Sequence, residues 1–318
     1  MKLIIQIPCY NEEQTIALTV RDLPRKIDGI DEIEYLVVDD GSTDRTAEVA
    51  KKSGVHHIVR LTKHQGLARA FAVCLEESLR LGADLIVTTD GDNQYEGADI
   101  ERVVRPILEG KADLVVGDRQ VENIPHFSFV KKKLQKLGSW AVRVVSGTEV
   151  PDAASGLRAF RRAVALQLNI FSSFSPTLEA IIQAGQKNMA VLSVPIRTNP
   201  PFRESRLIRT TSDYVLRQGF TILWVFMIYK PRRFFGFLGL GAFSLGLLLG
   251  VRFLYYYFIG HGQGHVQSLI MSSILLTMGF QLGLLALLAD LIAVNRSIVE
   301  EVRYRLRKTE GEDRKKAG

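Results

Sequence analysis

Cysteine is scarce in this chain of 318 residues, which contains only Cys9 and Cys74. Two thiols cannot build a disulfide scaffold, and their scarcity is typical of a protein from a reducing compartment. A zinc cluster is excluded as well, because Cys and His do not occur at the spacing that such clusters need. The glycine-loop motifs GxxxxGK[ST] and GxGxxG are also missing. Their absence argues against a P-loop and against a dinucleotide site.

Acidic residues are in the minority, since 34 Asp and Glu stand against 41 Lys and Arg and leave a formal charge of +7. An excess of this size favours an anionic partner, whether nucleic acid, a phosphorylated substrate or a membrane surface. Hydrophobic residues make up 47% of the chain. That share excludes a disordered chain, and the length allows about two domains.

Charge is nearly missing from two long apolar runs near the C-terminus. Residues 234–259 carry one charge, Arg252, and residues 268–289 carry none. As a helix, the first run would reach about 39 Å, enough to cross a hydrocarbon core of about 30 Å. Buried core helices are rarely so long and so uniformly apolar. The sequence therefore predicts two transmembrane helices, at about 234–259 and 268–292.

The distribution of basic residues predicts how these helices are oriented. The connecting segment, residues 260–265, contains no Lys or Arg, whereas basic residues crowd the far ends of both runs. The positive-inside rule therefore predicts an integral membrane protein whose N-terminal domain and both termini are cytoplasmic. Small residues in the first run suit close helix contacts, through which a homo-oligomer can form.

Residues 1 to about 200 alternate short β-rich runs with helical stretches. The expected strands are residues 3–7, 35–39, 57–61, 85–89 and 114–117. The expected helices are residues 13–26, 43–53, 67–81 and 98–108. Such a series predicts an α/β domain with a mostly parallel sheet, and ligands of such sheets bind beyond the carboxyl ends of the strands.

These patterns divide the chain into four segments. We expect a cytoplasmic α/β domain at 1–202, juxtamembrane interfacial helices at 203–233, two transmembrane helices within 234–295 and a charged cytoplasmic tail at 296–318. The second segment mixes basic and apolar residues. A helix of that composition can lie in the lipid headgroup layer.

Polar side chains follow three of the expected strands. They occur in the segments Pro8-Cys9-Tyr10-Asn11-Glu12, Asp39-Asp40-Gly41-Ser42 and Asp90-Gly91-Asp92-Asn93-Gln94. Asp90 and Asp92, separated by a glycine, can reach one divalent cation while the backbone bends closely around it. Taken alone, the triplet also fits a solvated turn. Its place at the end of a central strand, beside two other polar loops, favours a metal site.

The segments IPCYNEE, VVDDGSTDRT, TTDGDNQY and DAASGLRAFRR together resemble family 2 glycosyltransferases with the GT-A fold. The segment PPFRESRL and the C-terminal hairpin make the chain similar to polyprenyl-phosphate glycosyltransferases of the dolichyl-phosphate mannose synthase type. Two positions depart from the common pattern of that family, which has alanine at Gly91 and phenylalanine at Leu157. Both changes are small.

The resemblance implies a nucleotide-sugar donor, a Mg²⁺ or Mn²⁺ cofactor, a polyprenyl-phosphate acceptor and a membrane, with no nucleic acid among the partners. It also implies which residues hold the nucleotide and its metal-bound diphosphate: Pro8, Tyr10, Asn11, Glu12, Asp40, Asp90, Gly91, Asp92 and Gln94. Of these, Asp90 and Asp92 would bind the metal.

An acceptor phosphate calls for cations, because guanidinium groups bind phosphate through two parallel hydrogen bonds. The candidate acceptor residues are Arg119, Arg158, Arg203, Ser205 and Arg206. Asp152 occupies the region where members of the family carry an acceptor-side acid. It would orient the acceptor or an arginine, or only cap its loop. Asp90, Asp92, Arg119 and Asp152 are therefore the expected catalytic residues.

The nature of the acceptor decides whether a base is needed. A lipid monophosphate is largely ionised at pH 7 and needs none, and a single displacement would invert the anomeric configuration. A hydroxyl acceptor on a glycolipid or polysaccharide would need one, and Asp152 would have to serve. A third interpretation is a non-catalytic, membrane-tethered sensor or scaffold for nucleotide sugars. The intact Asp90 and Asp92 argue against it.

Overall fold

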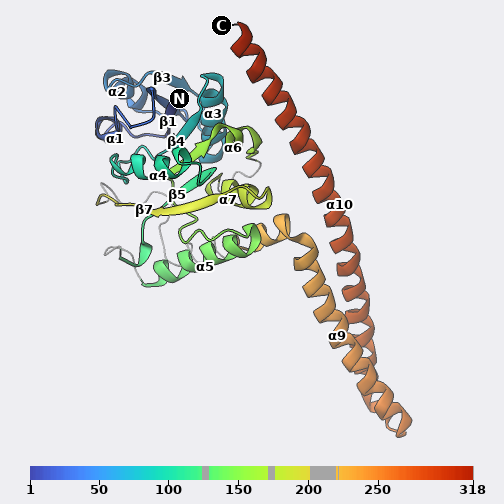
Figure 1. Ribbon diagram of the computed structural model, residues 1–318. Coiled ribbons are helices and arrows are strands. Elements are labelled where there is room, and N and C mark those ends of the chain that lie inside the picture. The colour runs from blue at the N-terminus through green and yellow to red at the C-terminus, as the bar shows by residue number, and fades with distance from the viewer. Residues whose placement is uncertain (124–128, 171–175, 201–219, 221, 318) are drawn as a thin grey trace. The chain divides into compact units, whose positions relative to one another are not determined.

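The computed structural model describes residues 1–123, 129–170, 176–200, 220 and 222–317. The chain divides into two compact units, residues 1–222 together with 301–318, and residues 223–300. The first contains the α/β domain and the second a helical hairpin (Figure 1). Most of the predicted juxtamembrane segment lies outside the described residues.

A seven-stranded sheet in the order β3-β2-β1-β4-β6-β5-β7 forms the centre of the first unit. Its strands are β1 (Lys2–Cys9), β2 (Glu32–Asp39), β3 (His57–Arg60), β4 (Leu85–Thr88), β5 (Leu114–Asp118), β6 (Arg158–Arg161) and β7 (Val191–Pro195). Strands β1 to β4 pair in parallel, as do β5 and β7, whereas β6 runs antiparallel between β4 and β5. The predicted mostly parallel sheet is confirmed.

Helices follow most of these strands along the chain. They are α1 (Ile16–Asp22), α2 (Thr46–Lys52), α3 (Leu67–Arg80), α4 (Asp99–Leu108), α5 (Phe129–Ser146), α6 (Arg162–Gln167) and α7 (Pro176–Gln186). In α3 the buried residues Phe71, Cys74, Leu75 and Ser78 recur at helical spacing, which gives the helix one face for the core. Consecutive residues of β1 are fully buried, as expected of a strand covered on both faces.

The direction of β6 determines what reaches the carboxyl edge of the sheet. Arg158, the first residue of β6, pairs with Thr88 at the end of β4 and with Val116 near the end of β5. In a reversed strand the first residue lies where the parallel neighbours finish. The segment before β6, residues 152–157, is thereby brought beside the loops that follow the parallel strands.

The sequence pattern did not predict β6 or β7. The sequence of β6 is Arg-Ala-Phe-Arg, four residues with a charge at each end, so neither a hydrophobic run nor a clear alternation marks it. β7 lies at an edge of the sheet and is only partly buried. Its pairing with β5 is fixed by tertiary contacts that a local pattern does not carry.

The second unit contains a long helix and most of another, whose last residues, from Glu301 on, belong to the first unit. α9 (Pro231–Phe258) and α10 (Val266–Ala317) are joined through a short 3-10 segment, η2 (Gly262–His265). Both helices contain stretches long and apolar enough to cross a membrane, with mean hydropathy 2.1 and 1.9. They cover the two predicted transmembrane runs, and α10 continues as a helix through the predicted charged tail.

Glycines of α9 let α10 approach closely. A Cβ on Gly246 would lie 2.9 Å from the Leu276 nitrogen, and one on Gly250 would lie 2.9 Å from Ser272 Oγ. The Ser272 hydroxyl donates a hydrogen bond to the Gly246 carbonyl at 2.6 Å. These small residues therefore serve contacts within the hairpin, and a homo-oligomer stays a prediction.

Candidate active site

The loops that follow β1, β2 and β4 are hydrogen-bonded to one another at the carboxyl edge of the sheet. The Asn11 N–H donates to Ser42 Oγ at 2.9 Å, which joins the loops after β1 and β2. The hydroxyls of Thr15 and Thr19 donate to the Gly91 carbonyl at 2.9 and 3.1 Å, which joins α1 to the loop after β4. The three polar segments picked out in the sequence therefore lie together.

Asp90 and Asp92 lie close enough for one charge to affect the ionisation of the other. Burial raises the pKa of Asp90 from 3.8 to about 6, the Asp92 carboxylate adds to the rise, and the charge of Arg119 opposes it. Gly156 packs directly against this carboxylate, since a Cβ at that position would lie 2.4 Å from Asp90 Oδ2. Crowded carboxylates with a raised pKa are stabilised when a cation binds between them.

The oxygen donors at this loop fit Mg²⁺ or Mn²⁺. Among the described residues, no third Asp, Glu, His or Cys joins Asp90 and Asp92 in a metal-binding group. Mg²⁺ commonly takes one or two carboxylates and completes its shell with water and substrate phosphates. The Asn93 side-chain oxygen is buried and has no hydrogen-bond partner in the described part of the chain, and the Gln94 N–H donates to Asp92 Oδ1 at 3.1 Å.

Tyr10 and His64 form an aromatic pair on the donor side, with ring centroids 3.9 Å apart and an interplanar angle of 24°. His64 Nδ1 lies 2.8 Å from Asp40 Oδ2, and the N–H groups of Gln65 and Gly66 each donate to that carboxylate at 2.8 Å. Asp40 was expected to face the nucleoside, and a contact of this kind stays a prediction. Its side chain is buried and holds the segment that carries His64, which was not among the predicted site residues.

The other predicted donor-side residues shape the loop between β1 and α1. Pro8 lies within β1. Asn11 has φ 55°, in the left-handed region that Asn tolerates, and its Oδ1 accepts a hydrogen bond from the Thr43 N–H at 2.9 Å. Glu12 Oε2, at 2.8 Å, shares the single Thr15 hydroxyl proton with the Gly91 carbonyl. Contacts of these residues with a nucleotide stay predictions.

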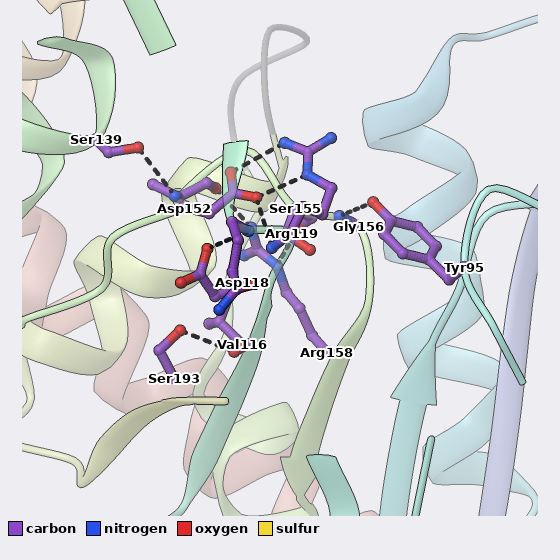
Figure 2. A network of polar contacts seen from close by, with 12 residues as sticks. Tyr95, Val116, Asp118, Arg119, Ser139, Asp152, Ser155, Gly156, Arg158 and Ser193 are labelled. Carbon is purple, nitrogen blue, oxygen red and sulfur yellow. Dashed lines mark hydrogen bonds and ion pairs between the residues drawn. The ribbon is translucent and has the colours of Figure 1, made fainter. Parts of the chain in front are cut away.

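Arg119 and Asp152 form a buried, two-pronged ion pair (Figure 2). Arg119 Nε donates to Asp152 Oδ2 at 2.7 Å, and Nη2 donates to Oδ1 at 2.9 Å. Burial acts to lower the pKa of Arg119, but its contacts with Tyr95 and Asp152 outweigh this and raise it. Ser139 of α5 supports the loop by accepting the Ala153 N–H at 3.1 Å. Of the roles predicted for Asp152, orienting an arginine is the one this geometry shows.

Arg158 differs from its predicted role as a ligand of the acceptor phosphate. Its side chain is 1% exposed, and its guanidinium donates to the carbonyls of Ser155, Ala153 and Thr177. Burial lowers its pKa to about 10, so the group stays charged at neutral pH. The Arg158 guanidinium therefore donates its hydrogen bonds to backbone carbonyls and holds residues 153–155 in place, instead of facing a ligand. The remaining acceptor candidates, Arg203, Ser205 and Arg206, lie outside the described residues.

Sequence reasoning missed two polar groups at the centre of this network. The buried Tyr95 hydroxyl accepts a hydrogen bond from the Gly156 N–H at 2.7 Å (Figure 2). The Ser155 hydroxyl is buried and finds no hydrogen-bond partner among the described residues. Tyr and Ser are ordinary loop residues, so nothing in the local pattern set them apart.

Comparison with known proteins agrees with this architecture. Residues 4–168 match the glycosyl transferase family 2 domain. The chain belongs to glycosyl transferase family 2. It is therefore an enzyme of the glycosyltransferase class, as its sequence motifs predicted.

Two relatives of known activity extend the comparison. The UDP-N-acetylglucosamine–dolichyl-phosphate N-acetylglucosaminyltransferase of Methanococcus voltae is 30% identical over 252 residues, covering 70% of this chain and 94% of that protein. The undecaprenyl-phosphate mannosyltransferase of Micrococcus luteus is 28% identical over 207 residues, covering 62% of this chain and 83% of that protein.

A solved structure with a similar fold is glucosyl-3-phosphoglycerate synthase from Mycobacterium tuberculosis, in complex with Mn²⁺, uridine diphosphate and phosphoglyceric acid. The two chains align with a TM-score of 0.54 at 20% identity, covering 71% of this chain and 77% of that one. At this identity the likeness shows the fold alone, and it confirms a GT-A-like domain.

Proposed function

We propose that this family 2 enzyme transfers one sugar from a nucleotide-diphosphate sugar to a polyprenyl phosphate at the cytoplasmic face of a membrane. The observation that carries the proposal is that two pairs of charged side chains meet at one edge of the sheet. One pair is the two carboxylates of Asp90 and Asp92, and the other is the ion pair of Arg119 with Asp152. The Asp90 carboxylate, which also interacts with Asp92, lies within electrostatic reach of the buried Arg119, which Asp152 holds through two hydrogen bonds. One pair suits a metal-bound diphosphate and the other suits a second phosphate.

On the donor side, Asp90 and Asp92 would hold Mg²⁺ or Mn²⁺ against the diphosphate. The metal would neutralise charge that develops on the departing nucleotide. The loop after β1, joined to the metal loop through Thr15 and Thr19, would contact the nucleoside through Tyr10. The Mn²⁺ and uridine diphosphate bound by the structurally similar synthase support this arrangement, although UDP and GDP donors both fit it.

On the acceptor side, Arg119 would contact the acceptor phosphate. Asp152 uses both carboxylate oxygens on this guanidinium and so fixes its orientation. A phosphate monoester is largely ionised at neutral pH and attacks without a base. Direct attack on the anomeric carbon, with the nucleotide diphosphate leaving from the opposite side, inverts the configuration at that carbon.

The geometry of Asp152 weighs against a hydroxyl acceptor. A general base must reach the proton that it abstracts, yet this carboxylate is 1% exposed and engaged by Arg119. The polyprenyl-phosphate substrates in the names of both relatives favour a lipid phosphate instead.

The hairpin of α9 and α10 would anchor the enzyme where a lipid phosphate is found. Its two apolar stretches suit a membrane, and the basic residues at the ends far from the connecting turn support a topology with both termini in the cytoplasm, by the positive-inside rule. A polyprenyl chain would remain in the bilayer while its phosphate reaches the edge of the sheet.

Transfer assays on the purified full chain in lipid nanodiscs test the proposal. The nanodiscs would contain undecaprenyl or dolichyl phosphate, and a panel of UDP- and GDP-sugars would be supplied. We expect a sugar-phospholipid product from one donor, its loss with EDTA and its return with Mn²⁺. The unphosphorylated polyprenol is the matched control. Equal transfer to polyprenol, or undiminished transfer in EDTA, would overturn the acceptor or the metal assignment respectively.

A further inference from the structure

Tyr95 joins the metal loop to the loop before β6. It lies between β4 and α4, its side chain is 4% exposed, and its backbone pairs with Thr198. Its hydroxyl oxygen accepts the Gly156 N–H at 2.7 Å, as Figure 2 shows, and the same hydroxyl opposes the rise in the pKa of the Asp90 carboxylate. Tyr95 thus acts on both sides of the site.

The direction of each hydrogen bond follows from the chemistry of the groups. A phenol has one proton to donate and lone pairs that accept. Because Gly156 supplies an N–H, the tyrosine oxygen accepts there, and its own proton remains available to the Asp90 carboxylate. Gly156 has no side chain, and a Cβ would lie 2.4 Å from Asp90 Oδ2. Gly156 therefore lies directly against both the Tyr95 hydroxyl and the Asp90 carboxylate.

Buried hydrogen bonds hold the loop before β6 in place. Arg158 holds the carbonyls of Ala153 and Ser155 through buried hydrogen bonds of 2.7 and 2.9 Å. Asp152, at the start of the same loop, holds Arg119. A shift at Gly156 therefore reaches the acceptor-side arginine through a short chain of packed groups.

We propose that Tyr95 is a positioning residue that couples metal binding at Asp90 to the arrangement of residues 152–158. The inference rests on the proposed function, because it takes Asp90 as a metal ligand. When a cation draws the Asp90 carboxylate toward itself, the tyrosine hydroxyl follows and carries the Gly156 amide with it. The acceptor-side loop then settles only when the donor side is occupied.

Hydrogen–deuterium exchange of the full chain in detergent, with and without Mn²⁺ and UDP or GDP, tests the coupling. Two peptides matter, one covering residues 88–98 and one covering residues 152–158. We expect Mn²⁺ with nucleotide to slow exchange in both peptides of the wild-type chain by at least about threefold. In Tyr95→Phe the first peptide should still respond and the second should not.

Tyr35→Phe is the matched control. Tyr35 is a second buried tyrosine, 6% exposed, whose hydroxyl donates to the Pro24 carbonyl at 3.1 Å within the core. The Tyr35→Phe change removes one hydrogen bond of a buried hydroxyl in another part of the domain. Both peptides should therefore respond to Mn²⁺ and nucleotide as they do in the wild type. Thermal melting of the two variants would show how much of any change reflects stability.

The outcomes separate this inference from the proposed function. Protection of 88–98 without protection of 152–158 in the wild type would overturn the coupling and leave the metal site standing. An equal response of 152–158 in wild type and Tyr95→Phe would overturn the role of Tyr95. No response in either peptide would contradict the metal site, and the inference with it. Because the first and last outcomes need only the wild type, the test does not depend on the variant folding.

A second readout is catalytic. In Tyr95→Phe we expect sugar transfer to fall about tenfold or more while nucleotide affinity changes by less than about threefold, since the variant retains Asp90, Asp92 and the loop after β1. Equal losses of transfer and nucleotide affinity would point to general disruption and count against a positioning role.

Discussion

The Cys9 sulfur fills the space into which a side chain at Gly91 would project, since a Cβ on Gly91 would lie 2.8 Å from Cys9 Sγ. Cys9 is 3% exposed and cannot move aside into solvent. Alanine is the common residue at this position in the family that the sequence resembles. The buried sulfur gives a physical reason for glycine here, because the loop that carries Asp90 and Asp92 rests directly on residue 9.

Gly91→Ala should therefore displace the metal loop. Overpacking of this kind costs about 1–3 kcal/mol, and we expect apparent Mn²⁺ affinity to fall about tenfold. Cys9→Ala in the same chain should restore most of the loss by making room for the new methyl group. The Mn²⁺ dependence of transfer and the melting temperature of both variants provide the check. A double variant no better than Gly91→Ala would contradict this account.

Asp152→Asn separates the two acceptor hypotheses. The change keeps the shape of the side chain and removes the charge that holds Arg119. Hydrogen bonds to charged groups contribute about 1.5–3 kcal/mol, so kcat/KM for the lipid phosphate should fall about 10- to 100-fold while donor affinity is nearly unchanged. Near-complete loss of kcat would instead indicate a base and a hydroxyl acceptor. Glu109→Gln, which breaks an exposed pair with Lys111, is the control and should have little effect.

Asp44 should stabilise the domain in a pH-dependent way. Its Oδ1 accepts the Thr46 N–H at 3.0 Å and its Oδ2 accepts the Glu13 N–H at 3.2 Å. Burial acts to raise its pKa, but these donors and the Thr46 hydroxyl lower it below 3.8. A lowered folded-state pKa means that the stabilisation is complete above the ordinary pKa and is lost as the pH falls through the folded value.

Asp44→Ala should accordingly lower stability by about 1 kcal/mol at pH 7, the usual net contribution of a hydrogen bond. The difference from wild type should shrink at an acidic pH below the lowered pKa of the wild-type carboxylate, where that group is protonated. Thermal unfolding at the two pH values measures both differences. An equal difference at both would show that the ionised form adds nothing.

Gly246 and Gly241 offer a matched test of the hairpin. A Cβ on Gly246 would lie within 3.0 Å of α10 atoms, whereas nothing lies within 4 Å of one on Gly241. Both glycines are inside α9, so alanine brings the same gain in helix propensity, about 1 kcal/mol, at either position. We expect Gly241→Ala to be neutral or stabilising and Gly246→Ala to lower the melting temperature in detergent. Identical effects would contradict close packing at Gly246.

The fold was largely predictable because its signals are local. Runs of Val, Ile and Leu in β1, β2, β4 and β5 mark buried parallel strands, and each coincides with a strand in the structure. The helices between them carry helical spacing and also fall where expected. β6 escaped prediction because its four residues are paired only through contacts distant in sequence.

The candidate site was predictable in position and less so in detail. That Asp90 and Asp92 meet the other polar loops follows from strand direction alone. The contacts of Asp40 and Arg158 could not be predicted from strand direction, because both side chains bind other parts of the protein. Asp40 contacts residues 64–66, and Arg158 donates hydrogen bonds to the carbonyls before β6. Sequence shows which groups carry charge, but only packing decides which of them remain available to a ligand.

The reversed strand β6 also bears on how the enzyme matures. A slip of one residue against β4 would exchange Arg158 with Ala159 and send the guanidinium to the opposite face of the sheet. The loop that orients Arg119 would lose its internal support at the same time. Since Thr88 and Arg158 lie 70 residues apart in the sequence, their pairing should form slowly, and a newly made chain should complete the proposed phosphate-binding edge only after β4 and β6 have paired.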